Sequence, residues 1–241
     1  MYLVIDRGNT NIKIGIGTLE GFVEVFLFQT LQHFQSVVEQ YKITSCIISS
    51  VAKEDELWDA LYQFLESKYL VKVFHHEMQL PLINDYQSEK LGADRIAAAV
   101  AASMIFNQKN VLVVDAGTCI NYEFVTQDKQ YKGGAISPGM CMRLQAMHVF
   151  TGKLPLIQQI AAWPTLIGND TSSSMLSGAI NGMGYEIDGF IDAYRAQYED
   201  LIVVLTGGDG AFFANTLKNK NFVAPNLVLT GLLYILNYNN E

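Results

Sequence analysis

The sequence is poor in cysteine, in basic residues and in long apolar runs, and each shortage excludes a class of protein. The three cysteines, Cys46, Cys119 and Cys141, are odd in number and lack the spacing of metal ligands, which fits a reducing cytosol. The longest mainly apolar run, residues 96–106, has eleven residues and is too short to span a bilayer. Because residue 2 already begins a predicted strand, no signal peptide is expected either. We therefore expect a cytoplasmic protein that has no membrane partner.

A basic surface is also missing. The formal net charge is −8, with 16 Lys and Arg against 24 Asp and Glu in 241 residues. Proteins that bind nucleic acids present clustered Lys and Arg to the phosphates, and no such cluster occurs, so we expect no nucleic-acid partner. Apolar residues make up 50% of the chain and charged residues 17%. This composition is typical of a packed globular protein, and the length suffices for one large domain or two small ones.

No Walker phosphate loop occurs in the sequence, so a nucleotide phosphate would have to be held in another way. Residues 2–16 offer one such way. An apolar run ends at the carboxylate of Asp6, and Gly8, Asn9 and Thr10 then predict a tight turn before a second strand. The turn N–H groups could cradle a phosphate, and Asp6 could hold a hydrated Mg²⁺ beside it. The alternative for one isolated copy is an ordinary hairpin with a polar turn.

This pattern occurs a second time. Residues 112–119 repeat it at a constant offset, with Asp115 in the place of Asp6 and Gly117 in the place of Gly8. In both copies an apolar strand leads to Asp, any residue and Gly, and a second strand follows. The second copy makes an ordinary hairpin a poorer explanation, because a local turn has no reason to recur with the same carboxylate.

A third glycine turn, Thr-Gly-Gly-Asp-Gly, follows another apolar strand and ends at residue 210. Two Asp-x-Gly hairpins and a later Gly-Gly turn indicate a duplicated domain that closes over a nucleotide. This arrangement resembles the superfamily of actin, sugar kinases and heat-shock chaperone ATPases. The resemblance implies an α/β fold with two ribonuclease-H-like halves, residues 1–109 and 110–241, and an active site in the cleft between them.

Two helices near the end of the chain carry further expectations. The first, over residues 171–198, contains Gly178, Gly182, Gly184 and Gly189. A glycine inside a helix costs roughly 1 kcal/mol relative to alanine, so four of them need a reason. Close packing within the fold and an interface between subunits both fit. The second helix, over residues 227–238, is expected to close the fold and to end in a frayed tail at 237–241.

A charged pair lies at the start of another predicted helix, which runs from about residue 91 to 107. The N-terminus of a helix favours a carboxylate, so Asp94 is suited to accept a proton from an attacking alcohol. Arg95 beside it could hold an anionic substrate or a transferring phosphoryl group. The residues alone leave a second interpretation open, in which Asp94 only caps the helix.

Six motifs in order across the chain resemble those of the type III pantothenate kinases. They are residues 6–13, 92–95, 115–118, 133–139, 168–171 and 206–208. The resemblance implies ATP-dependent phosphorylation of pantothenate at its primary hydroxyl, the first step towards coenzyme A. Two alternatives remain: a superfamily member that binds or regulates without turnover, and a kinase for another small alcohol.

The resemblance also implies roles for individual residues. Asp94 matches the catalytic base, and Asp115 matches the ligand of a monovalent cation, K⁺ or NH₄⁺. The residues that match ATP contacts are Asp6, Arg7, Gly8, Asn9, Thr10, Asn11, Ile12, Lys13 and Thr118. The residues that match pantothenate contacts are Tyr86, Gly92, Ala93, Asp94, Arg95 and Thr171. ATP is expected with Mg²⁺, held at Asp6 through water, in a homodimer whose pantothenate pocket borrows from the partner.

Two residues depart from the family pattern. Arg7 stands where a small apolar residue is usual, so its side chain must reach solvent or meet an anion. Asp170 stands where the family prefers an uncharged residue. Neither departure removes a proposed catalytic group.

Overall fold

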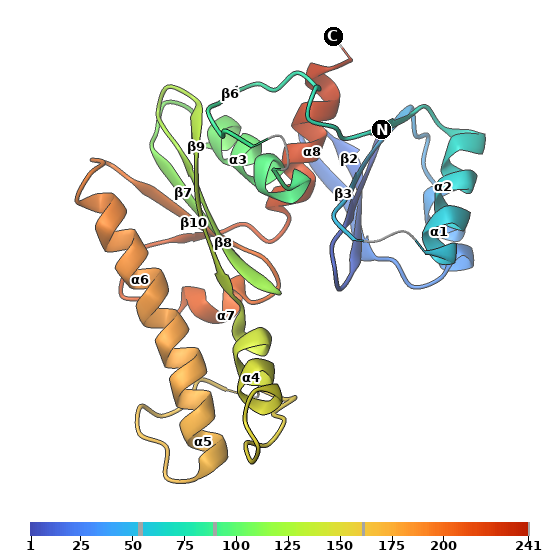
Figure 1. Ribbon diagram of the computed structural model, residues 1–241. Coiled ribbons are helices and arrows are strands. Elements are labelled where there is room, and N and C mark those ends of the chain that lie inside the picture. The colour runs from blue at the N-terminus through green and yellow to red at the C-terminus, as the bar shows by residue number, and fades with distance from the viewer. Residues whose placement is uncertain (53–54, 89–90, 161, 241) are drawn as a thin grey trace. The chain divides into compact units, whose positions relative to one another are not determined.

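The chain forms two compact units, which Figure 1 shows as a computed structural model. The described residues are 1–52, 55–88, 91–160 and 162–240. The first unit contains residues 1–108, 128–132 and 226–241, and the second contains residues 109–127 and 133–225. The change at residue 109 lies beside the expected division of the chain into halves. The end of the chain, however, returns to the first unit, because its last helix packs against elements of that unit.

The first unit is built on a five-stranded sheet. Its strands, in spatial order, are β3 (Gly21–Leu27), β2 (Ile12–Thr18), β1 (Tyr2–Arg7), β4 (Ser45–Ser50) and β5 (Val71–Val73). The first three strands form an antiparallel meander, and β4 and β5 run parallel to β1. Leu3, Val4 and Ile5 of β1 are buried because helices cover both faces of the sheet.

Helices cover both faces of this sheet (Figure 1). They are α1 (Leu31–Val38), α2 (Glu56–Lys68), α3 (Ala93–Ile105) and α8 (Leu227–Tyr238). Leu3 and Ile5 of β1 pack in one apolar cluster with the buried side chains of α1 and α2. Since successive strand residues point to opposite faces, Val4 and Asp6 point to the other face, where α8 contacts β1, β2 and β4. The end of β1 thus directs Asp6 towards α3 and α8.

The second unit contains its own sheet. Its strands, in spatial order, are β11 (Phe222–Val223), β10 (Ile202–Thr206), β7 (Val111–Ala116), β8 (Cys119–Val125) and β9 (Gln130–Pro138). The short strand β6 (Ile83–Asn84) pairs with Gln130 and Tyr131, which belong to the part of β9 assigned to the first unit.

The two sheets share one topology. The order β9-β8-β7-β10-β11 repeats β3-β2-β1-β4-β5, and in both the central strand pairs antiparallel with its hairpin partner and parallel with the strand after. Asp6 of β1 lies opposite Ser49 of the parallel strand β4. At the equivalent position of the second sheet, Asp115 of β7 lies opposite Thr206 of the parallel strand β10. The expected α/β fold with a duplicated sheet is therefore confirmed.

The helices of the second unit include the long glycine-bearing one. They are α4 (Met140–Val149), α5 (Thr171–Leu176), the π-helical turn η1 (Ser177–Asn181), α6 (Gly182–Arg195) and α7 (Gly210–Ala214). α5, η1 and α6 follow one another without a break, as the sequence predicts, with the π turn at their centre. Ile187 and Ile191 of α6 pack with Tyr122 and Phe124 of β8 in the core of this unit.

Candidate active site

Asp6 lies at the end of β1, where the first hairpin turns. The turn is closed by Gly8, whose N–H donates to the carbonyl oxygen of Asn11 at 3.0 Å. Ser49 of β4 donates its hydroxyl to Asp6 Oδ1 at 3.1 Å, which fixes the carboxylate beside the turn. Residues 9–11 at the tip are exposed, so a ligand can approach the turn from solvent. The strand and its neighbour thus present one oriented carboxylate next to a polar loop, as expected.

The charge of Asp6 is unfavourable in the protein alone. The pKa of Asp6 is raised to about 6, first by burial and second by the nearby carboxylate of Asp94. The hydrogen bond from Ser49 and the charge of Lys13 act against this shift. A hydrated divalent cation beside Asp6 would offset this cost, because its charge favours the ionised carboxylate.

Asp94 lies in the first turn of α3. The helix begins at Ala93 and its N-cap is Gly92, which has no side chain to cap it, so Asp94 does not occupy the N-cap position. Asp94 Oδ1 instead accepts the N–H of Arg95 at 2.9 Å. A Cβ added at Gly92 would lie 2.5 Å from that same oxygen, so the carboxylate would have to shift if any other residue stood there.

Arg95 and Tyr86 form a second pair at the same helix end. Arg95 is only 8% exposed, and its guanidinium carbon lies 5.4 Å from the centre of the Tyr86 ring. Arg95 Nη1 donates to the Tyr86 hydroxyl at 3.5 Å. A cavity of about 160 Å³ opens beside Tyr86, with Leu80 and Ile96 in its wall. A buried cation, a phenol and a carboxylate thus meet at the N-terminus of α3, which suits a small anionic acceptor that carries a hydroxyl.

Arg7 follows Asp6 on β1 but points to the opposite face of the sheet. Its side chain is buried, donates from Nη2 to Asp55 Oδ2 at 2.7 Å and stacks 4.6 Å from the centre of the Trp58 ring. The departure from the family pattern therefore meets an anion on α2, the second of the two outcomes that the sequence allowed. Because the side chain is engaged there, only the backbone of Arg7 is left as a candidate ATP contact.

Three turns of the second unit meet around the hairpin that begins at Asp115. Gly117 N–H donates to Cys119 O at 2.9 Å and closes the hairpin. Gly139 N–H donates to Thr118 O at 3.1 Å, and Asp209 N–H donates to Ala116 O at 2.9 Å. Thr118 is exposed and Asp115 is partly buried, so the hairpin offers a hydroxyl and a carboxylate at its rim.

Two glycines make this convergence possible, and the sequence pattern predicted no individual role for either. A Cβ at Gly139 would lie 2.1 Å from Gly117 O. Gly207 has φ +84°, and a Cβ there would lie 2.4 Å from Asp115 Oδ1. Both belong to motifs that the resemblance identified, which is the one signal that could have found them. Asp209 was also missed; it precedes α7, and burial raises the pKa of its carboxyl.

Thr171 is the first residue of α5 and lies apart from the Asp115 hairpin within the second unit. It borders an open groove of about 610 Å³ together with Gly168 of the preceding loop and Met147 of α4. Asp170 is the N-cap of α5 and accepts the N–H of Ser173 at 2.9 Å, which lowers the pKa of Asp170. The carboxylate that departs from the family pattern is thus explained by a capping box.

Comparison with known proteins assigns the chain to a family. The family model of type III pantothenate kinases matches residues 2–193. A protein of Bacteroides fragilis (strain YCH46) named type III pantothenate kinase is 43% identical over 243 aligned positions, which cover 100% of this chain and 99% of that protein. A second one, from Christiangramia forsetii, is 41% identical and covers 99% of each chain.

Solved structures agree on the fold. A protein of Campylobacter jejuni described as a putative Baf family transcriptional activator superposes with a TM-score of 0.63 at 20% identity, covering 99% of this chain and 98% of its own. A putative N-acetylmannosamine kinase of Listeria monocytogenes superposes with a TM-score of 0.52 at 12% identity, covering 100% and 99%. At these identities the likeness shows the fold alone, whereas the two sequence relatives and the family model show the family. The chain belongs to the type III pantothenate kinase family.

Proposed function

We propose that this protein transfers the γ-phosphoryl group of ATP to the primary hydroxyl of pantothenate, which yields 4′-phosphopantothenate and ADP. The observation that carries the proposal is the full-length match to relatives of that name at up to 43% identity. The site supports it, because a kinase needs a base and an anchor for its acceptor, and a binding module needs no base. The Campylobacter jejuni protein shares only the fold at 20% identity, so its title gives this chain no regulatory role.

The proposed chemistry uses the residues at the start of α3. The hydroxyl oxygen of pantothenate attacks the γ-phosphorus, the bond from that phosphorus to ADP breaks, and the hydroxyl proton passes to Asp94. Arg95 and Tyr86 hold the acceptor, and the hydrogen bond between them at 3.5 Å keeps the two side chains together at the N-terminus of α3. Mg²⁺, when bound with ATP, supplies positive charge to the phosphates, and Asp6 would hold it through water. The turn over residues 8–13 would cradle the phosphates with its N–H groups.

A monovalent cation, K⁺ or NH₄⁺, is proposed to bind at Asp115, with Thr118 as an ATP contact. The support is the closed hairpin, in which backbone oxygens and a carboxylate converge. Asp115→Asn removes the charge and keeps the size, so stimulation of ADP release by K⁺ or NH₄⁺ should weaken in this variant. Full activity of the wild type in Tris alone, with unchanged kinetics in Asp115→Asn, would contradict the assignment.

A homodimer is proposed as the functional assembly, with Thr171 of one subunit contributing to the acceptor pocket of the other. The second unit exposes large apolar side chains that a monomer would leave in water. The most exposed are Phe150 (84%), Ile167 (82%), Leu166 (67%) and Tyr185 (63%). A Cβ at Gly178 or Gly182 would meet nothing within 4 Å, so close packing inside the protomer does not explain these two helical glycines.

The compartment proposed is the cytoplasm. The described part of the chain contains no helix that is both long enough and apolar enough to cross a bilayer. Its cysteines, Cys46, Cys119 and Cys141, are free thiols, which suits a reducing compartment.

The test of the proposed function is release of ADP from ATP with pantothenate, compared with pantetheine, N-acetylmannosamine and glycerol as acceptors. A pantothenate kinase releases ADP with pantothenate at a kcat/KM well above that with the sugar or glycerol. A kinase for another alcohol reverses that preference, and a binding module releases no ADP with any acceptor. Mass spectrometry of the product should show the phosphate on pantothenate.

A further inference from the structure

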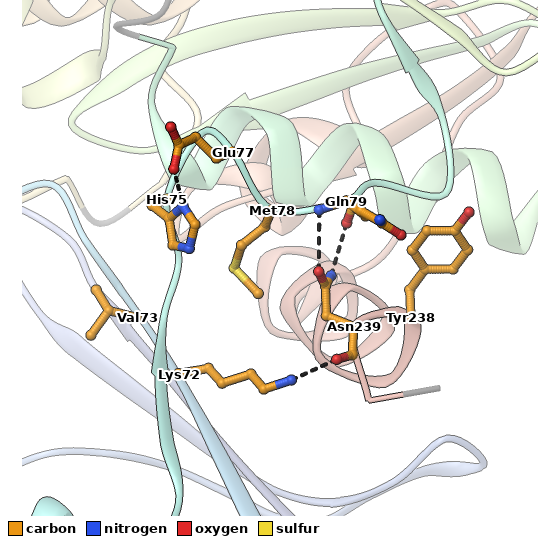
Figure 2. A pocket seen from close by; sticks show the side chains of 8 residues that line it. All are labelled: Lys72, Val73, His75, Glu77, Met78, Gln79, Tyr238 and Asn239. Carbon is orange, nitrogen blue, oxygen red and sulfur yellow. Dashed lines mark hydrogen bonds and ion pairs between the residues drawn. The ribbon is translucent and has the colours of Figure 1, made fainter.

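The end of the chain is bonded to the segment that leads to Tyr86 (Figure 2). The carboxamide of Asn239 makes two hydrogen bonds with the backbone of Gln79: Oδ1 accepts the N–H at 3.1 Å, and Nδ2 donates to the carbonyl oxygen at 2.8 Å. One side chain thus gives Gln79 the donor and the acceptor that a residue in an antiparallel strand would give it. Lys72 adds a third bond, from Nζ to Asn239 O at 2.7 Å. The frayed tail expected over 237–241 is therefore wrong as far as Asn239.

The helix that carries Asn239 is also fixed against the catalytic helix. Gly231 of α8 lies so close to α3 that an added Cβ would stand 1.8 Å from Ala97 O. Leu232 and Leu236 are fully buried along the same helix. Asp94 and Arg95 lie in the first turn of α3. The helix α8 therefore contacts the helix that supplies both the proposed base and the guanidinium proposed to hold the acceptor.

The segment held by Asn239 forms part of the wall of the cavity beside Tyr86, the residue proposed to contact the acceptor. Leu80, directly after Gln79, and Tyr86 line it together with Ile96 of α3. At its far end the segment is fixed by Asp85, whose N–H donates to Tyr131 O at 3.1 Å. This segment thus forms one wall of the cavity, and α3 forms another. The C-cap residue of α8, Asn239, is hydrogen-bonded to the segment, and α8 itself packs against α3.

We propose that α8 braces the acceptor pocket and that Asn239 is a positioning residue for the acceptor. By holding Gln79 and Leu80 in position, Asn239 keeps the Tyr86 side chain at its distance from Arg95. The proposal rests on the proposed function in that the acceptor is pantothenate. Because Asn239 touches neither the base nor the phosphate loop, it affects binding of the acceptor and leaves phosphoryl transfer and ATP binding unchanged.

Removal of the bonds should leave the protein folded. A cavity of about 660 Å³ lies beside them, with Lys72, Met78 and Tyr238 in its wall (Figure 2). Gln79 is exposed, so water can replace the Asn239 carboxamide at its backbone. The variants therefore test position and not folding.

The experiment compares Asn239→Ala with Asn240→Ala, the exposed neighbour, as a matched control. In Asn239→Ala, which loses both hydrogen bonds to Gln79, we expect KM for pantothenate to rise about fivefold or more, with kcat and KM for ATP unchanged. Asn239→Asp keeps the acceptor for the Gln79 N–H and loses the donor, so its KM should fall between wild type and Asn239→Ala. Asn240→Ala should behave as wild type in every measurement.

Hydrogen exchange provides a readout that is independent of turnover. Amides of residues 79–86 should exchange faster in Asn239→Ala than in wild type and Asn240→Ala. Wild-type exchange there, or faster exchange with an unchanged KM for pantothenate, would overturn the proposal, as would a joint change in kcat and both KM values. If the wild type does not phosphorylate pantothenate, the proposed function fails, and the exchange of residues 80–86 still decides whether Asn239 holds the cavity wall.

Discussion

At the scale of the residue, two carboxylates of the first unit stand in different surroundings, and we propose a different role for each. Asp94 stands at a helix N-terminus, where a negative charge is favoured, and its Oδ1 accepts one backbone N–H. Asp6 stands at a buried strand end, where its charge is disfavoured until a cation arrives. One group is thus suited to accept a proton and the other to hold a metal.

Asp94→Asn should remove the base and keep the fold. The amide oxygen of Asn can still accept the N–H of Arg95, so the melting temperature should change little. A placed general base typically contributes about 10²–10⁴ in rate, so kcat should fall by roughly 10²-fold or more. Steady-state kinetics and ATP binding by calorimetry measure the two effects. A folded variant with wild-type kcat would falsify the role of Asp94.

Asp6→Asn should stabilise the protein without ligands and abolish its activity. The pKa of Asp6 is raised from 3.8 to about 6, so the folded state holds a proton that the unfolded state has lost between these pH values. The free energy of unfolding therefore falls as pH rises through this window, and above it the ionised Asp6 costs about 3 kcal/mol. The variant avoids this cost.

Thermal melts at pH 7.5 and pH 4 measure this effect. The Asn variant should melt higher than wild type at pH 7.5, and most of the difference should disappear at pH 4, where Asp6 is protonated in the folded state and the unfolded state, with its pKa of 3.8, has begun to bind the proton as well. Mg²⁺ with ATP should raise the melting temperature of the wild type more than that of the variant. A variant that melts lower than wild type at pH 7.5 would contradict the assignment.

At the scale of the element, Arg7 joins the strand of the phosphate hairpin to α2. Asp55 serves both elements, because Oδ1 caps the helix at Trp58 N and Oδ2 accepts the guanidinium of Arg7. The Arg7 side chain is 5% exposed and the Asp55 side chain is 60% exposed. Removal from water therefore costs more free energy for the charge of Arg7 than for the charge of Asp55. Loss of the exposed partner leaves a buried charge, whereas loss of the buried partner leaves an exposed one.

Asp55→Asn should therefore destabilise the protein more than Arg7→Met. We expect about 2 kcal/mol for Asp55→Asn, whose amide can still cap α2, and about 1 kcal/mol for Arg7→Met, which keeps an apolar contact with Trp58. In the double variant the effect of Asp55→Asn should largely disappear, since the buried guanidinium is gone. Urea denaturation of the four proteins measures the cycle, and strictly additive effects would show that the two side chains are not coupled.

At the scale of the whole molecule, substitutions at the helical glycines can distinguish packing within a protomer from contact between protomers. Gly182 has open space where a side chain would lie, whereas a Cβ at Gly184 would lie 3.2 Å from the Trp163 ring. The two positions on one helix thus provide a matched pair. Gly182→Leu should leave the melting temperature of the protomer close to wild type, and Gly184→Leu should lower it.

Gly182→Leu should also weaken the proposed dimer and raise KM for pantothenate, because the acceptor pocket would lose the partner's contribution. Light scattering across a concentration series measures association, and kinetics at the same concentrations measures the pocket. An active wild-type monomer would exclude the shared pocket. A Gly182→Leu protein that associates as wild type would place the interface elsewhere.

Local sequence patterns predicted most of the helices and strands and the positions of the candidate carboxylates on them. The apolar run that ends at Asp6, and its repeat at Asp115, predicted two equivalent strand ends, and the paired register of the two sheets agrees. The helix expected from about residue 91 placed Asp94 in its first turn. These features follow from the sequence because strand alternation, turn glycines and helix starts depend on neighbours a few residues apart.

Only the tertiary structure decided which distant groups meet. Arg7 meets Asp55 across 48 residues, and Asn239 meets Gln79 across 160, although neither partner carries a local signal for the other. The end of the chain belongs to the first unit because α8 packs against α3 and the first sheet, a consequence of which apolar faces fit together. Periodicity shows that α8 has an apolar face, but the shape of Gly231 against Ala97 selects the surface that it covers. The sequence by itself thus determined the elements and their carboxylates, and long-range packing decided how α8 and Asn239 support the pocket.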